Sequence, residues 1–534
     1  MTSGQRSSSL LSVIAHARAG ALDQAWRIFH QAGLDAETDD PRALSVKGRL
    51  LKDFALRSEG DEKMRFYRQA ASAYQRAAKL GQATYPLINA ATLSLLAGDD
   101  DKARTLAAQV IDWIEANPDE PETPYYHGAT LAEALLLLGK DSKARAALSD
   151  AITVAPRAWE DHASTLRQFA LILRARQAPA EWLDMLRPPR SLHFSGHMSF
   201  KADSPAGELS EHMARMIAEE RIGFGFGALA AGADIIIAQA LLDAGAELHA
   251  ILPGGVKAFA ARSVDPFGAA WRTRFDAVLE RAETVRPVRP EGVPPDETII
   301  DTASTIAMGL AIKHARGLES EAIQCLVIDP DQPHASLGAS TLRAGDAWKR
   351  AGLRQRTIEA PRQTAASPKE AAEPVDGGHH AYALLAIGSR ERRAPTPPAE
   401  GELADLHEAV AGMQTALAPH WSGEYLILAF ERPENAVAAG LELIRAGWPV
   451  GGDFSVGLPI FDPFTEKQRL PMQSVAACCG ACASSLERSF QATEDLVVAL
   501  APGAPNACTA ELVGELESPA GEYPIPLFSL RPRL

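Results

Sequence analysis

Residues 221–255 constrain the fold of this chain most, because glycine turns there separate two apolar runs from a helical stretch. The segment is RIGFGFGALAAGADIIIAQALLDAGAELHAILPGG. Its pattern predicts a strand at GFGFG, a helix at ADIIIAQALLDAG and a second strand at AELHAIL. Strands joined by a helix at this spacing run parallel, with a right-handed crossover. The chain must therefore contain a parallel sheet at this position.

The same alternation extends over residues 187–360. SLHFSGHMSF predicts an earlier strand that ends at Ser195, and AIQCLVIDP predicts a last buried strand after two further helices. The pattern predicts a Rossmann-like parallel α/β domain. Ligands of such sheets bind outside the carboxyl ends of the strands.

Glycines and one aspartate mark the central strand end. Gly225 and Gly227 would let the backbone approach a ligand, and Gly232 and Asp234 stand at the start of the next helix. Free amides there favour a phosphate or another anion. The Asp234 carboxylate could instead occupy those amides as a cap, or face a ribose hydroxyl or a reacting anomeric carbon. The alternative is turn glycines and a helix cap with no ligand.

Three segments carry a family resemblance: SGHMSF, GALAAGADIIIAQALLDAGAELHAILP and SVDPFGAAWRTRF. They resemble the SLOG superfamily, a Rossmann-like group that includes the LOG phosphoribohydrolases and DprA, and most of all its branch linked to tetratricopeptide repeats and related to the regulatory region of apoptosis signal-regulating kinases. The resemblance implies a nucleotide or nucleotide-derived ligand. The candidate ligand-binding residues are Ser195, Gly196, His197, Gly225, Gly227, Gly232, Asp234, Pro253, Gly254 and Gly338.

Turnover of such a ligand is less expected than binding. PGGVKAFAA lacks the glycine, threonine and glutamate of the phosphoribohydrolase signature PGGxGTxxE. No catalytic residue is assigned, and His197 is a loop histidine for which simple solvation is the alternative to an acid or base role. An N-glycosidase acting through Asp234 remains the rival interpretation from the enzyme class.

Residues 1–186 show an internal repeat of a small residue, three spacers, a large residue, two spacers and a small residue. Its copies are Ala25/Phe29/Ala32, Ala70/Tyr74/Ala77, Ala103/Ala107/Val110 and Ala144/Leu148/Ala151. Small residues let antiparallel helices approach, and stacked units bury the large ones. The pattern resembles the second helix of the tetratricopeptide repeat. It predicts an α-solenoid whose concave face binds a protein segment or a neighbouring domain of this same chain, with an irregular helical bundle as the alternative.

Residues 361–378 are rich in Pro, Ala and charge and predict a linker to a third domain at 379–534. The order strand, helix, hairpin, helix, strand predicts a ferredoxin-like α/β domain. WSGEYLILAFERPENAVAAGLEL, FSVGLPIF and ELVGELESPAGEYPIPLFSL resemble a class III nucleotidyl cyclase homology domain.

Cyclase chemistry needs two carboxylates that hold two metal ions. Ile387 or a neighbour stands where the first aspartate belongs, and Glu424 lies roughly at the second. One carboxylate cannot build that site, so we expect a degenerate, non-catalytic domain that dimerises or senses a ligand.

Composition excludes several classes. The 53 basic and 68 acidic residues give a net charge of −15, which would repel nucleic acid. No secretory or membrane-spanning segment is evident, so a cytoplasmic location is expected. Cys478, Cys479 and Cys482 lack further ligands nearby, so small buried helix residues are expected rather than a metal site.

These observations predict a cytoplasmic signalling protein that senses a nucleotide-type ligand, has no other expected cofactor, and contacts a protein partner through its repeats. The alternatives are a nucleotide N-glycosidase and a ligand-free repeat scaffold.

Overall fold

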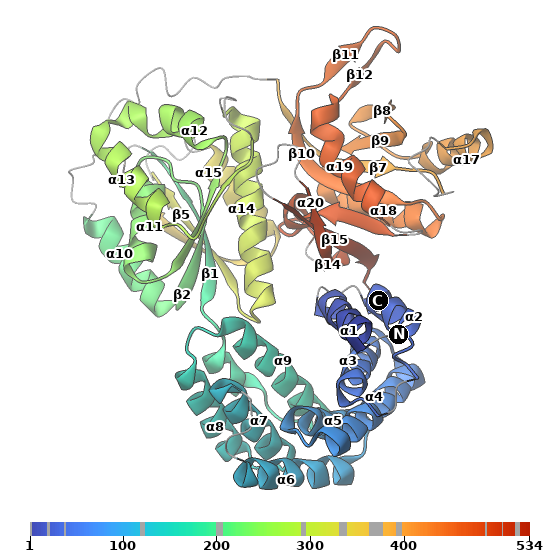
Figure 1. Cartoon of the computed structure of the whole chain (residues 1–534). Coiled ribbons are helices and arrows are strands. Elements are labelled where there is room, and N and C mark those ends of the chain that lie inside the picture. The colour runs from blue at the N-terminus through green and yellow to red at the C-terminus, as the bar shows by residue number, and fades with distance from the viewer. Residues whose placement is uncertain are drawn as a thin grey trace. The chain divides into compact units, whose positions relative to one another are not determined.

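The computed structural model divides the chain into two compact units (Figure 1). One comprises Met1–Pro188 with Gly317–Glu319, and the other comprises Pro189–Arg316 with Ser320–Arg533. The structure describes residues 3–18, 22–36, 39–117, 123–198, 207–289, 295–329, 339–361, 378–390, 398–485, 489–504, 506–517 and 524–533.

The first unit is helical and carries the repeats. Its described elements are α1 (Ser3–Arg18), α2 (Leu22–Gln31), α3 (Pro41–Arg57), α4 (Gly60–Gly81), α5 (Thr84–Leu96), α6 (Asp100–Ala116), α7 (Pro124–Leu137), α8 (Asp141–Val154), α9 (Trp159–Ala175) and the 3-10 helix η1 (Glu181–Leu186). The predicted small and large residues lie buried on α2, α4, α6 and α8, except Ala32, which follows the end of α2 and is partly buried. The repeat prediction is therefore confirmed as a helical region with TPR-like repeats.

Packing explains the repeat spacing. Gly48 of α3 faces the ring of Tyr74 of α4, and a β-carbon at Gly48 would stand 2.5 Å from that ring. Close approach of paired helices requires a small residue opposite each large one. Asp40 caps α3 by accepting from the amide of Arg42 at 2.8 Å, and Pro41 opens the helix.

The second unit begins with a six-stranded parallel sheet in the order β4-β3-β2-β1-β5-β6. Its strands are β1 (Arg190–Gly196), β2 (Ile222–Gly227), β3 (Glu247–Leu252), β4 (Thr284–Pro287), β5 (Ala322–Ile328) and β6 (Arg354–Glu359). The predicted parallel α/β domain is present. The chain crosses from β4 to β5, which pairs with β1, so the strand order reverses between β1 and β5.

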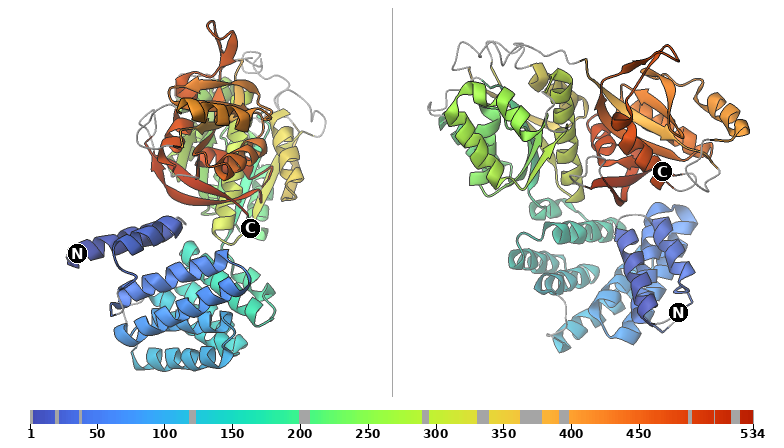
Figure 2. Two further views of the ribbon diagram at one scale, coloured as in Figure 1. Left: turned by 90° about the vertical axis from the view of Figure 1, so that its right-hand side faces the viewer. Right: turned by 45° about the horizontal axis from the view of Figure 1, so that its top comes forward.

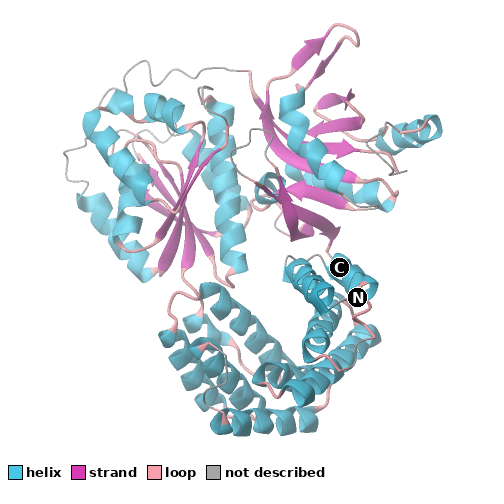
Figure 3. Cartoon of the chain, in the orientation of Figure 1, coloured by secondary structure: helices cyan, strands magenta, loops and turns pink. Residues whose placement is uncertain are grey.

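Helices cover both faces of this sheet (Figure 3). They are α10 (Gly207–Glu219), α11 (Ala233–Asp243), α12 (Val256–Ser263), α13 (Ala269–Arg281), α14 (Glu297–Gly317) and α15 (Ala339–Arg350), with the 3-10 helix η2 (Asp265–Phe267). Leu241 of α11 meets the glycine side of β2 at Gly225. His314 of α14 packs against the other side of β2, with its ring 4.3 Å from that of Phe224.

The rest of the second unit is a seven-stranded sheet in the order β14-β15-β13-β10-β7-β9-β8. Its elements are β7 (His380–Ile387), α17 (Glu400–Val410), β8 (Leu417–Ser422), β9 (Tyr425–Phe430), α18 (Pro433–Arg445), β10 (Val450–Gly457), α19 (Met472–Ser484), β13 (Phe490–Thr493), α20 (Glu494–Leu500), β14 (Cys508–Leu516) and β15 (Ile525–Pro532). A separate hairpin joins β11 (Ile460–Asp462) to β12 (Lys467–Arg469). The predicted order strand, helix, hairpin, helix, strand corresponds to β7 to β10. Below, this part is called the C-terminal domain.

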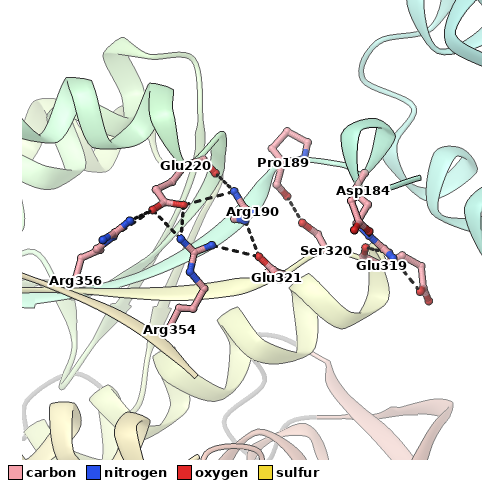
Figure 4. Close-up of polar contacts among 10 residues, drawn as sticks. Asp184, Pro189, Arg190, Glu220, Glu319, Ser320, Glu321, Arg354 and Arg356 are labelled. Carbon is pink, nitrogen blue, oxygen red and sulfur yellow. Dashed lines mark hydrogen bonds and ion pairs between the residues drawn. The ribbon is translucent and has the colours of Figure 1, made fainter. Parts of the chain in front are cut away.

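A charged cluster ties together the amino-terminal edge of the parallel sheet (Figure 4). Glu220 is 7% exposed and contacts Arg190 at 3.5 Å, Arg354 at 2.9 Å and Arg356 at 2.5 Å. Burial disfavours the Glu220 carboxylate, but the hydrogen bonds and charges of Arg356 and Arg354 outweigh it and hold its pKa below the ordinary value. One buried carboxylate therefore links β1, β6 and the turn before β2.

Glu220→Gln is expected to lower the free energy of unfolding of this domain by about 2 kcal/mol, less than for a fully buried pair because the arginines are partly exposed. Because the native pKa of Glu220 is lowered, its contribution is present above the unfolded pKa and is lost as the pH falls. The free energies of unfolding of the unaltered chain and the variant, measured in urea, should therefore converge in acid. Glu321→Gln, at a 55% exposed carboxylate bound to Arg190, is the control. Equal losses for the two variants would contradict this role of Glu220.

Candidate functional site

A cavity of about 140 Å³ opens at the carboxyl ends of β1 and β3. Residues of α11, α12, α14 and α15 complete its wall, together with the loop after β2. It therefore lies beside the point where the strand order reverses, at the edge where parallel sheets bind ligands. The apolar part of the wall includes Phe194, Phe259 and Ile300, which gives the cavity surfaces suited to a flat apolar group.

Four of the predicted site residues line this cavity: Ser195, Gly196, Asp234 and Pro253. Ser195 and Gly196 end β1, and Pro253 follows β3. The hydroxyl of Ser195 lies 3.0 Å from that of Thr341 on α15, so each hydroxyl has a partner across the cavity wall.

The glycines of β2 are explained by packing. A β-carbon at Gly225 would stand 2.4 Å from Leu241, and one at Gly227 would stand 2.7 Å from Phe194. Gly232 has a φ of +112°, and a β-carbon there would stand 2.7 Å from the carbonyl oxygen of Met198. None of these glycines lines the cavity, because their missing side chains make room for the protein itself.

Three further predicted residues also fall outside the cavity wall or the described chain. His197 is buried, and its Nε2 lies 2.7 Å from the carbonyl oxygen of Ala360. Gly254 follows Pro253 without lining the cavity. Gly338 lies outside the described residues.

The expectation of open amides is wrong for Ala230, Ala231 and Ala233, in the turn after β2 and at the start of α11. The carboxylate of Asp234 accepts from the amide of Gly196 at 3.0 Å and from that of Ala230 at 3.3 Å. The amides of Ala231 and Ala233 donate to the carbonyl oxygens of Ser263 and His197. The protein's own carboxylate therefore occupies the turn after β2, where it binds amides that precede α11 and not the first amides of that helix.

Asp234 is 6% exposed and lines the cavity. Burial raises its pKa to about 7, although its two backbone donors act in the opposite direction. The group therefore titrates near neutral pH, where a carboxyl can both accept and release a proton.

Several residues that line the cavity were not predicted from the sequence. His193 of β1 is buried, lies 3.1 Å from the side-chain nitrogen of Gln324, and stacks on Trp348. Burial lowers its pKa to about 3, so the imidazole is neutral. Alternation along β1 places His193 and Ser195 on one face, and this was the only signal available.

α14 and α15 bring polar groups to the same cavity. The Nε of Arg343 lies 2.7 Å from Asp301, and Glu297 lies 3.9 Å from Arg343. Within the described ranges the buried hydroxyl oxygen of Ser304 has no hydrogen-bond partner. The wall thus offers a ligand an unsatisfied hydroxyl and carboxylates, while Arg343 is already paired with acids.

In the C-terminal domain, an apolar core residue occupies one of the two positions expected for cyclase carboxylates, and a glutamate in a turn occupies the other. Ile387 ends β7 and is fully buried in the apolar core, and Glu424 lies in the turn between β8 and β9. Across the described residues no group of three or more His, Cys, Asp or Glu side chains is placed to hold a metal ion.

The cysteines of α19 pack this helix on the sheet. The Sγ of Cys478 lies 3.3 Å from the carbonyl oxygen of Gly451, and the Sγ of Cys482 lies 3.6 Å from that of Pro449. Both side chains are fully buried, and burial raises the pKa of the Cys478 thiol well above its ordinary value. The prediction of small buried helix residues is confirmed for these two positions.

A family model described as Tetratricopeptide Repeats-Sensor matches residues 5–94. No curated protein sequence matches the chain. In the described residues, no helix is both long and apolar enough to cross a bilayer.

The chain shows weak structural similarity to solved adenylyl and guanylyl cyclase domains. The adenylyl cyclase CyaB from P. aeruginosa is 9% identical, with 29% of this chain and 97% of that chain covered and a TM-score of 0.24. An adenylate/guanylate cyclase/hydrolase from Silicibacter pomeroyi is 11% identical, with 29% and 99% covered and a TM-score of 0.23. The guanylate cyclase domain of RhGC from Catenaria anguillulae, in complex with GTP, is 7% identical, with 29% and 98% covered and a TM-score of 0.23.

Proposed function

We propose that this chain is a signalling protein whose parallel α/β domain binds a small nucleotide-derived ligand in the cavity beside β1 and β3. The observation that carries the proposal is a partly apolar cavity at the strand-order reversal that also holds the buried carboxyl of Asp234 and the unpartnered hydroxyl of Ser304. Apolar walls with a few polar groups are typical of small-molecule sites.

The nucleoside part is the group that this cavity fits best. Asp234 occupies the turn after β2, and Arg343 is held by Asp301. Carboxylates accept hydrogen bonds from ribose hydroxyls or base N–H groups, and Phe194 and Phe259 offer apolar contact to a base. Phosphates of such a ligand would therefore point away from Asp234.

Calorimetric titration of the full chain with adenosine, AMP, cyclic AMP and ADP-ribose tests the proposal. We expect binding of at least one compound, weakened about five- to tenfold by Ser304→Ala, since a hydrogen bond contributes about 1 kcal/mol. If the ionised form of Asp234 accepts from the ligand, affinity should rise between pH 6 and pH 8. Ser484→Ala, at an exposed serine of α19, is the control. Absence of binding across the panel would remove the sensor function.

An N-glycosidase is the second candidate, because Asp234 has a pKa of about 7 and lies in the cavity. A carboxyl with this pKa is suited to acid or base catalysis at neutral pH. Chromatography of nucleotides incubated with the chain separates the two candidates, since only the enzyme releases free base.

The same proposal covers the remaining parts. The TPR-like repeats bind a protein partner. The C-terminal domain is non-catalytic, because Ile387 or a neighbouring buried apolar residue of β7 stands where the first metal-binding aspartate would be needed. Dimerisation through that domain, a cytoplasmic location and the absence of a nucleic-acid partner also belong to this proposal.

A further inference from the structure

Helix α14 forms one wall of the cavity. Glu297, Ile300, Ala303, Ser304 and Ala307 line it. These residues recur every three or four positions, so they occupy one face along the first three turns of the helix. A ligand in the cavity would therefore lie directly against α14.

The same helix contacts the C-terminal domain from other faces (Figures 1 and 2). The hydroxyl of Thr298 donates to the carbonyl oxygen of His379 at 3.0 Å. Two turns beyond the cavity, the Nζ of Lys313 lies 2.5 Å from Glu494, the first residue of α20, and 4.6 Å from the centre of the Phe528 ring. α14 thus borders both the cavity and the start of α20.

There is no clearance between α14 and α20 at one point. A β-carbon at Gly309 would stand 1.9 Å from the carbonyl oxygen of Val498, so the two helix backbones touch. Packed elements this close cannot move independently, because protein interiors have few voids. A shift of α14 away from the cavity would have to displace α20.

Charge fixes this junction further. Arg286 of β4 lies 2.8 Å from Glu494 and also pairs with Asp495. Burial opposes ionisation of Glu494, but the charges of Lys313 and Arg286 outweigh it and lower the pKa of Glu494, so this carboxylate stays ionised between them. From α20 the connection continues inward, because Thr493 donates to Asp453 of the central strand β10 at 2.5 Å.

We propose that occupancy of the cavity is transmitted through α14 to α20 and the central strand of the C-terminal domain. The proposal rests on the proposed function in taking the cavity as the ligand site, and it names the domain that receives the signal. Small shifts are transmitted between packed elements because such interfaces do not deform continuously.

Filling the cavity with protein tests the proposal without any ligand. Ala303→Phe fills it from α14, and Ser263→Phe fills it from α12, on a different wall. Hydrogen exchange of the full-length variants should change about fivefold or more in peptides covering 490–500, a typical coupling between sites. Peptides covering α17, in the same domain but away from this junction, should stay within about twofold.

A response to both substitutions supports transmission. A response to Ala303→Phe alone would overturn the proposal, since that result reflects distortion of α14 itself. The absence of a response to either substitution, in variants whose circular dichroism shows native folding, would also overturn it. If a filled variant does not fold, the smaller Ala303→Leu and Ser263→Leu replace the pair. The nucleotide titration is a separate measurement. If the filled variants respond but the unaltered chain binds no nucleotide of the panel, transmission through α14 is supported and only the sensor function is removed.

Discussion

Gly451→Ala is expected to destabilise the C-terminal domain by about 3 kcal/mol or more, at the upper end of overpacking effects. Gly451 lies in β10, directly under α19, and a β-carbon there would stand 2.2 Å from both the carbonyl oxygen of Cys478 and the amide nitrogen of Cys482. These are backbone atoms of a packed helix, so no side-chain rotation can relieve the clash. The helix itself would have to move off the sheet.

Urea unfolding measured by hydrogen exchange in peptides of β10 and α19 checks this expectation. Gly412→Ala is the matched control, because nothing lies within 4 Å of a β-carbon built there. Its effect should stay within about 0.5 kcal/mol, as for other surface substitutions. Equal stability of the Gly451→Ala and Gly412→Ala chains would show that α19 does not pack on β10 as the structure has it.

The elements of the fold were predictable where one local pattern decides them. The spacing of Ala70, Tyr74 and Ala77 can be satisfied only by one buried face of a helix, and these residues lie buried on α4. In the same way, apolar runs too short for helices and separated by glycine turns predicted β2 and β3. Neither pattern depends on distant parts of the chain.

The site could be predicted only in part, because it depends on distant parts of the chain. Ser304 and Arg343 reach the cavity only because the crossover from β4 to β5, which contains α14, places β5 beside β1, and α15 follows β5. A glycine can make room for a ligand or for a neighbouring side chain of the protein, and the sequence alone does not distinguish these two roles. Gly225 and Gly227 were expected to admit a ligand, but they admit Leu241 and Phe194.

Asp234→Asn is expected to make the parallel α/β domain more stable than the unaltered domain at neutral pH, by up to about 4 kcal/mol. Burial raises the native pKa of Asp234 to about 7, whereas an unfolded aspartate titrates at its model value of 3.8. Between these values the unfolded chain loses its proton while the native carboxyl keeps it. The stability contributed by the protonated group is therefore complete in acid and falls by about 1.4 kcal/mol per pH unit towards pH 7.

Asparagine does not titrate, so the variant should lack this part of the pH dependence. The amides of Gly196 and Ala230 donate to different oxygens of Asp234, and asparagine keeps only one of these two acceptors. The variant should therefore be less stable than the unaltered chain in acid by about 1 kcal/mol, an offset that does not change with pH. Urea unfolding at pH 4, 5.5 and 7, measured by hydrogen exchange in peptides of β1 and α11, gives the difference in free energy of unfolding between the variant and the unaltered chain. Asp453, whose pKa burial also raises to about 7, is present in both chains and cancels. A difference that stays constant with pH would mean that Asp234 is ionised throughout, held by its two backbone donors rather than neutralised by burial.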